Sequence, residues 1–201
     1  NLLGEEQSGQ IRDVGYELYQ SMLEETISKI RGGQIDVLTS MDNQWSPQIN
    51  LGVSVLIPES YVADLDVRLG LYRRLSNLSK KVEFEGFAAE LIDRFGKLPP
   101  EVNTLLLVVR IKSVCKKAGI GKLDGGPKGA TVQFHNDKFI SPEGLVEFIK
   151  KQNGLAKIKD NKLIIKRDWK KNSDKFKGAF SIARDLAEIA ASYQNNSLAK
   201  N

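Results

Sequence analysis

Two carboxylates, Glu90 and Asp93, lie three positions apart in a stretch with strong helical periodicity. This spacing places both on one turn of a helix, opposite the apolar residues Phe84, Leu91 and Phe95. Paired carboxylates can carry out acid–base catalysis where their surroundings separate their pKa values. A convex helix face provides no such surroundings, so the sequence indicates either a solvated face or an acidic docking surface for a basic partner.

Other residue types that often carry chemistry are scarce. The chain has one cysteine, Cys115, and one histidine, His135. Cys115 lies in a helical apolar pattern, which favours a packed core thiol over a nucleophile, and a lone cysteine cannot anchor a cysteine-based metal site. His135 falls at a strand end, where a solvent-facing or hydrogen-bonded imidazole is expected. We predict no catalytic residue and no metal site.

The glycine-rich stretch 124–129 (DGGPKG) invites comparison with phosphate-binding loops. It has neither the Walker spacing nor the dinucleotide-binding spacing, and it leads into a strand rather than a helix. Glycine and proline in this arrangement are typical of a hairpin turn, which is what we predict.

A basic segment covers residues 150–177, with eleven lysines or arginines and three aspartates. The segment carries +8, whereas the rest of the chain carries −3, within a total of +5. Such a segment can bind phosphate, but charge alone supports only non-specific binding. Trp169 and Phe176 are its only aromatic residues, too few for a base-stacking ladder. The pattern therefore favours a solvated lysine-rich surface over contact with nucleic acid.

The elements that position these residues follow from apolar periodicity and turn signals. We predict an arm helix over residues 11–30, a strand over 49–57 and helices over about 64–75, 82–95 and 100–118. A hairpin over about 120–134, a helix from 142 to about 152, a second hairpin over 157–166 and a last helix capped by Ser173 follow. The order β-ααα-ββ-α-ββ-α predicts an α+β fold with a small, mostly antiparallel or mixed sheet covered by helices.

Length and composition agree with a globular chain of this kind. The 201 residues are 41% apolar and 27% charged, and no apolar run reaches the ~20 residues of a membrane-spanning helix. The sequence begins with Asn1 rather than methionine, so we expect a piece of a longer protein.

Several stretches together resemble the bacterial transcription-repair coupling factors. Residues 1–9 (NLLGEEQSG) resemble the end of the translocation motif that this family shares with the RecG branch-migration enzyme. Further stretches resemble the family's carboxy-terminal domain and occur in the same order: 49–52 (INLG), 57–58 (IP), 68–75 (RLGLYRRL), 90–96 (ELIDRFG), 98–99 (LP) and 126–129 (GPKG). Each stretch is weak alone, but the series spans nearly the whole chain.

The resemblance implies a role in DNA repair. Members are ATP-driven translocases on double-stranded DNA that displace stalled RNA polymerase and recruit nucleotide excision repair through UvrA. Upstream motor domains of the parent would bind ATP and magnesium, so we expect no cofactor and no catalysis in this segment. The implied location is cytoplasmic, without a membrane partner. The carboxy-terminal domain is expected to pack on the UvrB-like module and mask its UvrA-binding surface.

The resemblance also assigns residues. Gln7 matches the glutamine that couples ATP hydrolysis to movement, and we expect it to be inert without its arginine partner. Glu90 and Asp93 match the acidic positions of ELIDRFG, and we expect them to contact arginines of the UvrB-like module. The alternative is an accessory DNA-binding module acting through residues 150–177, with possible phosphate contacts from Lys166, Arg167, Lys170 and Lys171.

These inferences divide the chain into four parts. Residues 1–10 would end the motor motif, and residues 11–47 would form the arm helix and a linker. Residues 48–194 would form the regulatory domain, followed by a frayed tail over 195–201.

Overall fold

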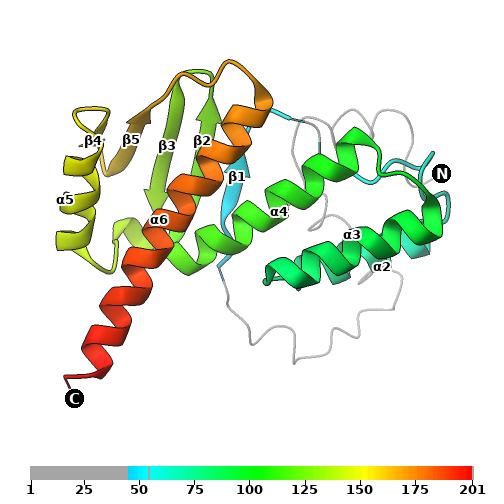
Figure 1. Ribbon diagram of the computed structural model, residues 1–201, viewed down its shortest axis with the longest axis horizontal. Helices are drawn as coiled ribbons and strands as arrows, with labels where there is room; N and C mark the ends of the chain where they lie inside the picture. Colours follow the sequence, from blue (N-terminus) through cyan, green and yellow to red (C-terminus); the bar gives the residue numbers. More distant parts are fainter. Residues whose placement is uncertain (1–44, 54, 201) are drawn as a thin grey trace. The chain divides into compact units, whose positions relative to one another are not determined.

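The computed structural model describes residues 45–53 and 55–200 (Figure 1). Gln7 and the predicted arm helix lie outside the described residues. Within them the elements are β1 Gln48–Asn50, α2 Leu65–Ser76, α3 Lys81–Phe95, α4 Pro100–Ala118, β2 Ile120–Gly126, β3 Gly129–Phe134, the short 3-10 helix η1 His135–Asp137, α5 Pro142–Lys151, β4 Ala156–Lys159, β5 Lys162–Lys166 and α6 Asn172–Leu198. Five α-helices and a five-stranded mixed sheet in the described chain confirm the predicted α+β class.

The described residues form two compact units. Unit 1 comprises residues 45, 53 and 55–106, and unit 2 comprises residues 46–52 and 107–200, so the boundary falls within helix α4. The predicted single domain over 48–194 therefore contains two compact parts. None of the helices in the described ranges is long and apolar enough to cross a membrane.

Unit 1 is built around the apolar faces of α2 and α3. Helix α2 begins where the Asp64 carboxylate accepts a hydrogen bond from the Val67 N–H at 2.9 Å. Phe84, Phe87 and Leu91 of α3 are buried, as their helical spacing predicts. Both helices lie within two residues of their predicted bounds.

The predicted strand over residues 49–57 is wrong beyond Asn50, where β1 ends. Gly52 has a φ of +65°, and its N–H donates to the Asn50 side chain at 3.2 Å, so the chain turns out of the extended conformation. Further along, the Ile57 N–H donates to the buried Tyr72 hydroxyl at 2.7 Å instead of to a neighbouring strand. Leu51 and Ile57 are buried, but neither belongs to a strand of the described chain.

The sheet of unit 2 has the strand order β1-β2-β3-β5-β4, with β1 parallel to β2 and the other pairs antiparallel. Both predicted hairpins are present, and Asp160 and Asn161, each with positive φ, form the two-residue turn between β4 and β5. Helices α5 and α6 and the carboxyl end of α4 lie on one face of the sheet (Figure 1). That face carries the buried row Leu123, Val132 and Leu163.

The two helices after the first hairpin differ in how they begin. Helix α5 has the predicted cap, since the Ser141 hydroxyl accepts a hydrogen bond from the Gly144 N–H at 3.1 Å. Helix α6 instead begins at Asn172 with Lys171 as its N-cap, and no side chain caps it, so the predicted Ser173 cap is wrong. The helix continues to Leu198, past residue 195, where a frayed tail was expected.

Candidate interaction surfaces

The predicted carboxylate pair lies on α3, and its two members have different surroundings. Glu90 accepts hydrogen bonds from both terminal nitrogens of Arg74, at 2.7 Å and 2.6 Å, and from Arg94 at 3.0 Å. Asp93 is exposed and forms no ion pair with any described residue. The structure therefore brings Glu90 together with two arginines and leaves Asp93 available to a partner.

The arginine contacts change the electrostatics of Glu90. The Arg74 hydrogen bonds, followed by that from Arg94, lower the pKa of the Glu90 carboxyl from 4.5 to about 2. The same pairing raises the pKa of Arg74. The Glu90 carboxyl is therefore ionised at neutral pH.

Neighbouring groups fix the carboxyl end of α3. The Tyr61 hydroxyl lies 3.0 Å from the Leu91 carbonyl oxygen and 2.8 Å from that of Gly96, and burial raises its pKa. The Arg94 guanidinium lies 4.8 Å from the ring centroid of Phe95. Asp93 is thus presented from a helix end held in place by several contacts.

Apolar side chains lie exposed on the same helix as Asp93. Ile92 is 50% exposed and Val82 is 75% exposed. Glu85, Gly86 and Ala89 lie between them and are also exposed. Exposed apolar side chains near a free carboxylate can bind a partner that carries both an apolar side chain and a cation.

The basic segment 150–177 does not form one surface, because it includes the end of α5, the β4–β5 hairpin and the start of α6. Of the four predicted phosphate contacts, Arg167 donates to the Lys166 carbonyl oxygen and to Gln152, and Lys170 lies 3.5 Å from Asp168. The Lys166 and Lys171 side chains are exposed and form no ion pair within the described chain. Lys166 ends β5, whereas Lys171 immediately precedes α6.

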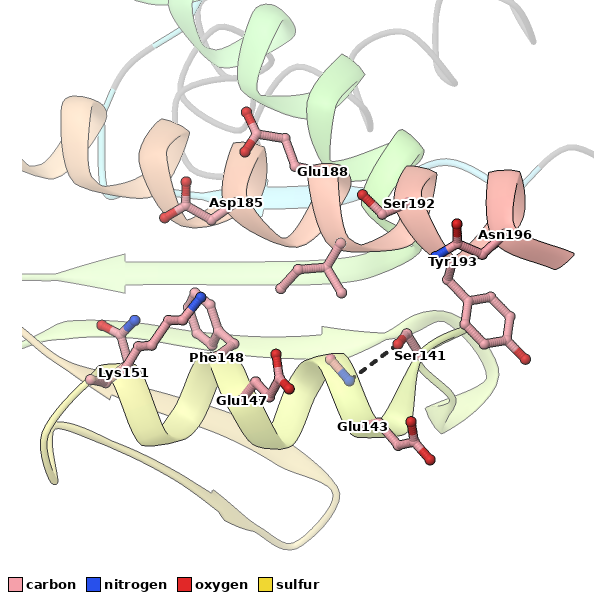
Figure 2. Close-up of a pocket in the computed structure, with 13 residues that line it drawn as sticks. Ser141, Glu143, Glu147, Phe148, Lys151, Asp185, Glu188, Ser192, Tyr193 and Asn196 are labelled. Carbon is pink, nitrogen blue, oxygen red and sulfur yellow. Dashed lines mark hydrogen bonds between the residues drawn. The ribbon is translucent and has the colours of Figure 1, made fainter. Parts of the chain in front are cut away.

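A groove of about 600 Å³ lies between α5 and α6 in unit 2 (Figure 2). Figure 2 shows the carboxylates of Glu143 and Glu147 on α5 and those of Asp185 and Glu188 on α6 along its two sides. Lys151 is the one cation among its lining residues. The groove is therefore acidic, although unit 2 as a whole carries a net charge of +11.

The isolated cysteine and the glycine-rich turn occupy structural positions, as the sequence predicts. Cys115 is buried in α4, and burial raises the pKa of its thiol far above the ordinary value, so the thiol is unreactive. Residues 124–129 span the end of β2, the turn and the start of β3, which confirms the hairpin. The described residues contain no cluster of histidine, cysteine, aspartate or glutamate suited to a metal ion.

Sequence reasoning missed the features that only folding creates. Arg74 belongs to the RLGLYRRL stretch, but nothing in the sequence indicated that it pairs with Glu90, which lies sixteen residues away. The helical spacing of Glu90 and Arg94 could have signalled their ion pair, since residues four apart share a helix face. No local signal pointed to the α5–α6 groove, whose two sides are more than thirty residues apart.

Comparisons with known proteins agree with this fold. The sequence model of the TRCF domain matches residues 51–145. The transcription-repair-coupling factor of Rickettsia conorii (strain ATCC VR-613 / Malish 7) is 48% identical over 165 residues, which cover 82% of this chain and 14% of that protein. The factor of Escherichia coli (strain K12) is 34% identical over 151 residues, which cover 75% of this chain and 13% of that protein.

A crystal structure of the C-terminal domain of a transcription-repair coupling factor has the same fold. It superposes with a TM-score of 0.61 and 22% identity, covering 74% of this chain and 96% of that one. The fold and the matched segment define the class of this chain, an α+β domain of the TRCF type. The chain belongs to the transcription-repair-coupling factor family and spans about one seventh of the length of the curated relatives it matches.

Proposed function

We propose that this chain is a regulatory interaction segment of a transcription-repair coupling factor. The whole protein is then a cytoplasmic, ATP-driven translocase on double-stranded DNA that displaces stalled RNA polymerase and recruits nucleotide excision repair through UvrA. In this proposal α3 packs against the UvrB-like module and masks the surface that binds UvrA. ATP and magnesium bind upstream motor domains, and this segment itself is not catalytic.

The observation that carries the proposal is the exposed face of α3, where Asp93 lies free beside the half-exposed Ile92. An arginine on the UvrB-like module can form a two-pronged contact with a carboxylate of this kind. Such a contact can be both specific and reversible, because charge pairs at the rim of an interface set register more than affinity.

Because the two arginines pair with Glu90 and not with Asp93, the two acidic residues have different roles. Three of the roughly four lone-pair sites of the Glu90 carboxylate already accept hydrogen bonds from Arg74 and Arg94. Glu90 and its two arginines together carry a charge of +1, which opposes an incoming arginine. We therefore assign the main partner contact to Asp93 and a positioning role to Glu90.

The test uses the longer protein that contains this segment. Replacing Asp93 with arginine should expose the UvrA-binding surface and increase the UvrA retained in a pull-down by about tenfold, which corresponds to the loss of ~1.4 kcal/mol of masking. Glu59→Arg makes the same charge change at an exposed position that forms no ion pair in the described chain, and it should leave UvrA retention unchanged. Equal retention for Asp93→Arg and the parent protein would contradict the masking role.

A further inference from the structure

The face of the sheet that the helices of unit 2 leave uncovered is strongly basic. Side chains alternate between the two faces of a strand, so every second residue of each of the five strands lies on this face. We name this set the open face; its charged members are five lysines and one aspartate: Lys122, Lys157, Lys159, Lys162, Lys166 and Asp124.

Four of these lysines lack an acidic partner. Asp124 lies 3.8 Å from the Nζ of Lys122, which accounts for the one carboxylate on the open face. The lysines of the β4–β5 hairpin are exposed and form no ion pair within the part of the chain that the structure describes. Asp160 in the hairpin turn forms none either. The open face therefore holds four uncompensated charges on two adjacent strands.

This arrangement opposes the stability of the hairpin. Lys159 and Lys162 are directly opposite each other in the β4–β5 register, and like charges in such a pair destabilise a sheet. The repulsion extends along both strands, because Lys157 and Lys166 lie on the same face. Costs of this kind are typical of surfaces retained for binding.

The other residues of the open face indicate which polyanion it suits. The face has no aromatic side chain on which bases could stack, which disfavours recognition of single strands. Its one large aliphatic side chain, Ile164, is only partly exposed, so the face offers little to insert into a lipid surface. Thr131 and Gln133 lie between the lysine clusters and provide the hydroxyl and amide donors that accompany lysine at phosphate groups.

We infer that the open face binds the phosphate backbone of double-stranded DNA, with Lys157, Lys159, Lys162 and Lys166 as its main contacts. Lysines two positions apart on a strand are separated by about 6.8 Å, and neighbouring strands by about 4.8 Å, so the four charges form one compact patch. The contacts reach no base edge, and the binding is independent of sequence.

The acidic groove itself does not suit DNA. Its carboxylates belong to α5 and α6, which cover the opposite face of the same sheet (Figures 1 and 2). Four carboxylates beside one lysine disfavour a phosphate backbone at the groove, in contrast to the lysines of the open face. All four lysines lie in the segment 150–177 that the sequence offered as a DNA-binding alternative, but of the four phosphate contacts named there only Lys166 lies on the open face.

The experiment measures binding of a fluorescently labelled duplex of about 20 base pairs to this chain over salt concentrations from about 50 to 200 mM. About four phosphate contacts should give a slope of log affinity against log salt near −3.6, and affinity should fall about a hundredfold across that range. Replacing all four lysines with glutamine should reduce the slope to between about −1 and 0 and weaken binding at low salt at least tenfold.

A matched control removes the same charge elsewhere. Lys117, Lys138, Lys177 and Lys200 are exposed, lie off the open face and form no ion pair in the described chain. Their fourfold glutamine variant should keep most of the slope. Thermal denaturation checks folding, and the open-face variant should be no less stable than the parent chain.

Three results would overturn the inference. One is unchanged duplex binding by the open-face variant, and another is an equal loss in the control variant, which would mean that net charge alone drives binding. The third is competition by polyglutamate of the same total charge, or by anionic vesicles, as strong as that by unlabelled duplex. None of these outcomes bears on the masking role of Asp93, because the assay contains neither UvrA nor the UvrB-like module.

Discussion

Helix α3 in unit 1 and the open face in unit 2 both carry clustered charges, but the clusters have different partners. The Glu90 carboxylate accepts three hydrogen bonds from Arg74 and Arg94 within its own unit. The lysines of the β4–β5 hairpin form no ion pair with any residue in the described ranges. Satisfied charges stabilise and position a surface, whereas unsatisfied charges are available to a partner.

The contrast extends to the whole chain. Unit 2 carries a net charge of +11, so the rest of the sequence carries −6. The total of +5 conceals this separation. On helix α3 of unit 1, Asp93 is free and lies beside the paired Glu90, which suits recognition of a particular cation. In unit 2 several equivalent lysines share a flat face, which suits a repeating anion.

The largest effect is expected from removing a side chain that packs beneath the α3 surface. Leu91, the residue between Glu90 and Ile92 in the sequence, is fully buried. Leu91→Ala should therefore lower the free energy of unfolding by about 2–5 kcal/mol. Hydrogen exchange should show loss of protection along α3. Val82→Ala on the same helix, where the side chain is 75% exposed, should change the free energy of unfolding by less than about 0.5 kcal/mol. Similar losses for both variants would show that Leu91 does not support this surface.

A smaller effect is expected from removing the paired charge itself. The pKa of Glu90 is lowered from 4.5 to about 2, so ionised Glu90 contributes stability above about pH 4.5, and this contribution disappears as pH falls through about 2. Because the side chain is 33% exposed, Glu90→Gln should lower the free energy of unfolding by only about 1 kcal/mol at pH 7.

Urea unfolding at neutral and acidic pH measures this contribution of Glu90. The difference between the parent chain and Glu90→Gln should shrink toward zero as the pH falls to about 2. Asp93→Asn serves as the comparison, because Asp93 forms no ion pair in the described chain, and it should have little effect at either pH. A constant difference across the pH range would rule out the ion pair as its cause.

The smallest effect should have the opposite sign. Lys159→Gln removes one of two directly opposed lysines and should raise the free energy of unfolding by about 0.2–1 kcal/mol. Added salt should reduce this gain, since it screens the repulsion between exposed charges. Thermal denaturation at low and high salt measures both effects, with Lys138→Gln as the control. Destabilisation by Lys159→Gln would show that the open face does not carry unrelieved repulsion.

Most of the secondary structure follows from local patterns in the sequence. The apolar spacing of Phe84, Phe87 and Leu91 is sufficient to predict α3, because a helix repeats locally and needs no distant partner to define its buried face. The hairpin predicted over residues 157–166 is likewise present, with Asp160 and Asn161 at its turn. The same local logic failed for residues 51–57, where the Tyr72 hydroxyl and the left-handed Gly52 replaced the expected strand contacts.

Which charged residues are paired, and which share a face, depends on the tertiary structure. The sequence predicts Glu90 as a free docking residue, but folding brings Arg74 to it across sixteen positions. The basic segment is continuous in sequence, but the fold distributes its members over α5, the β4–β5 hairpin and α6. Lys122 joined the lysines of β4 and β5 because three strands of one sheet place them on a common face. Coulomb interactions depend on distance in space, which the order of residues along a chain does not specify.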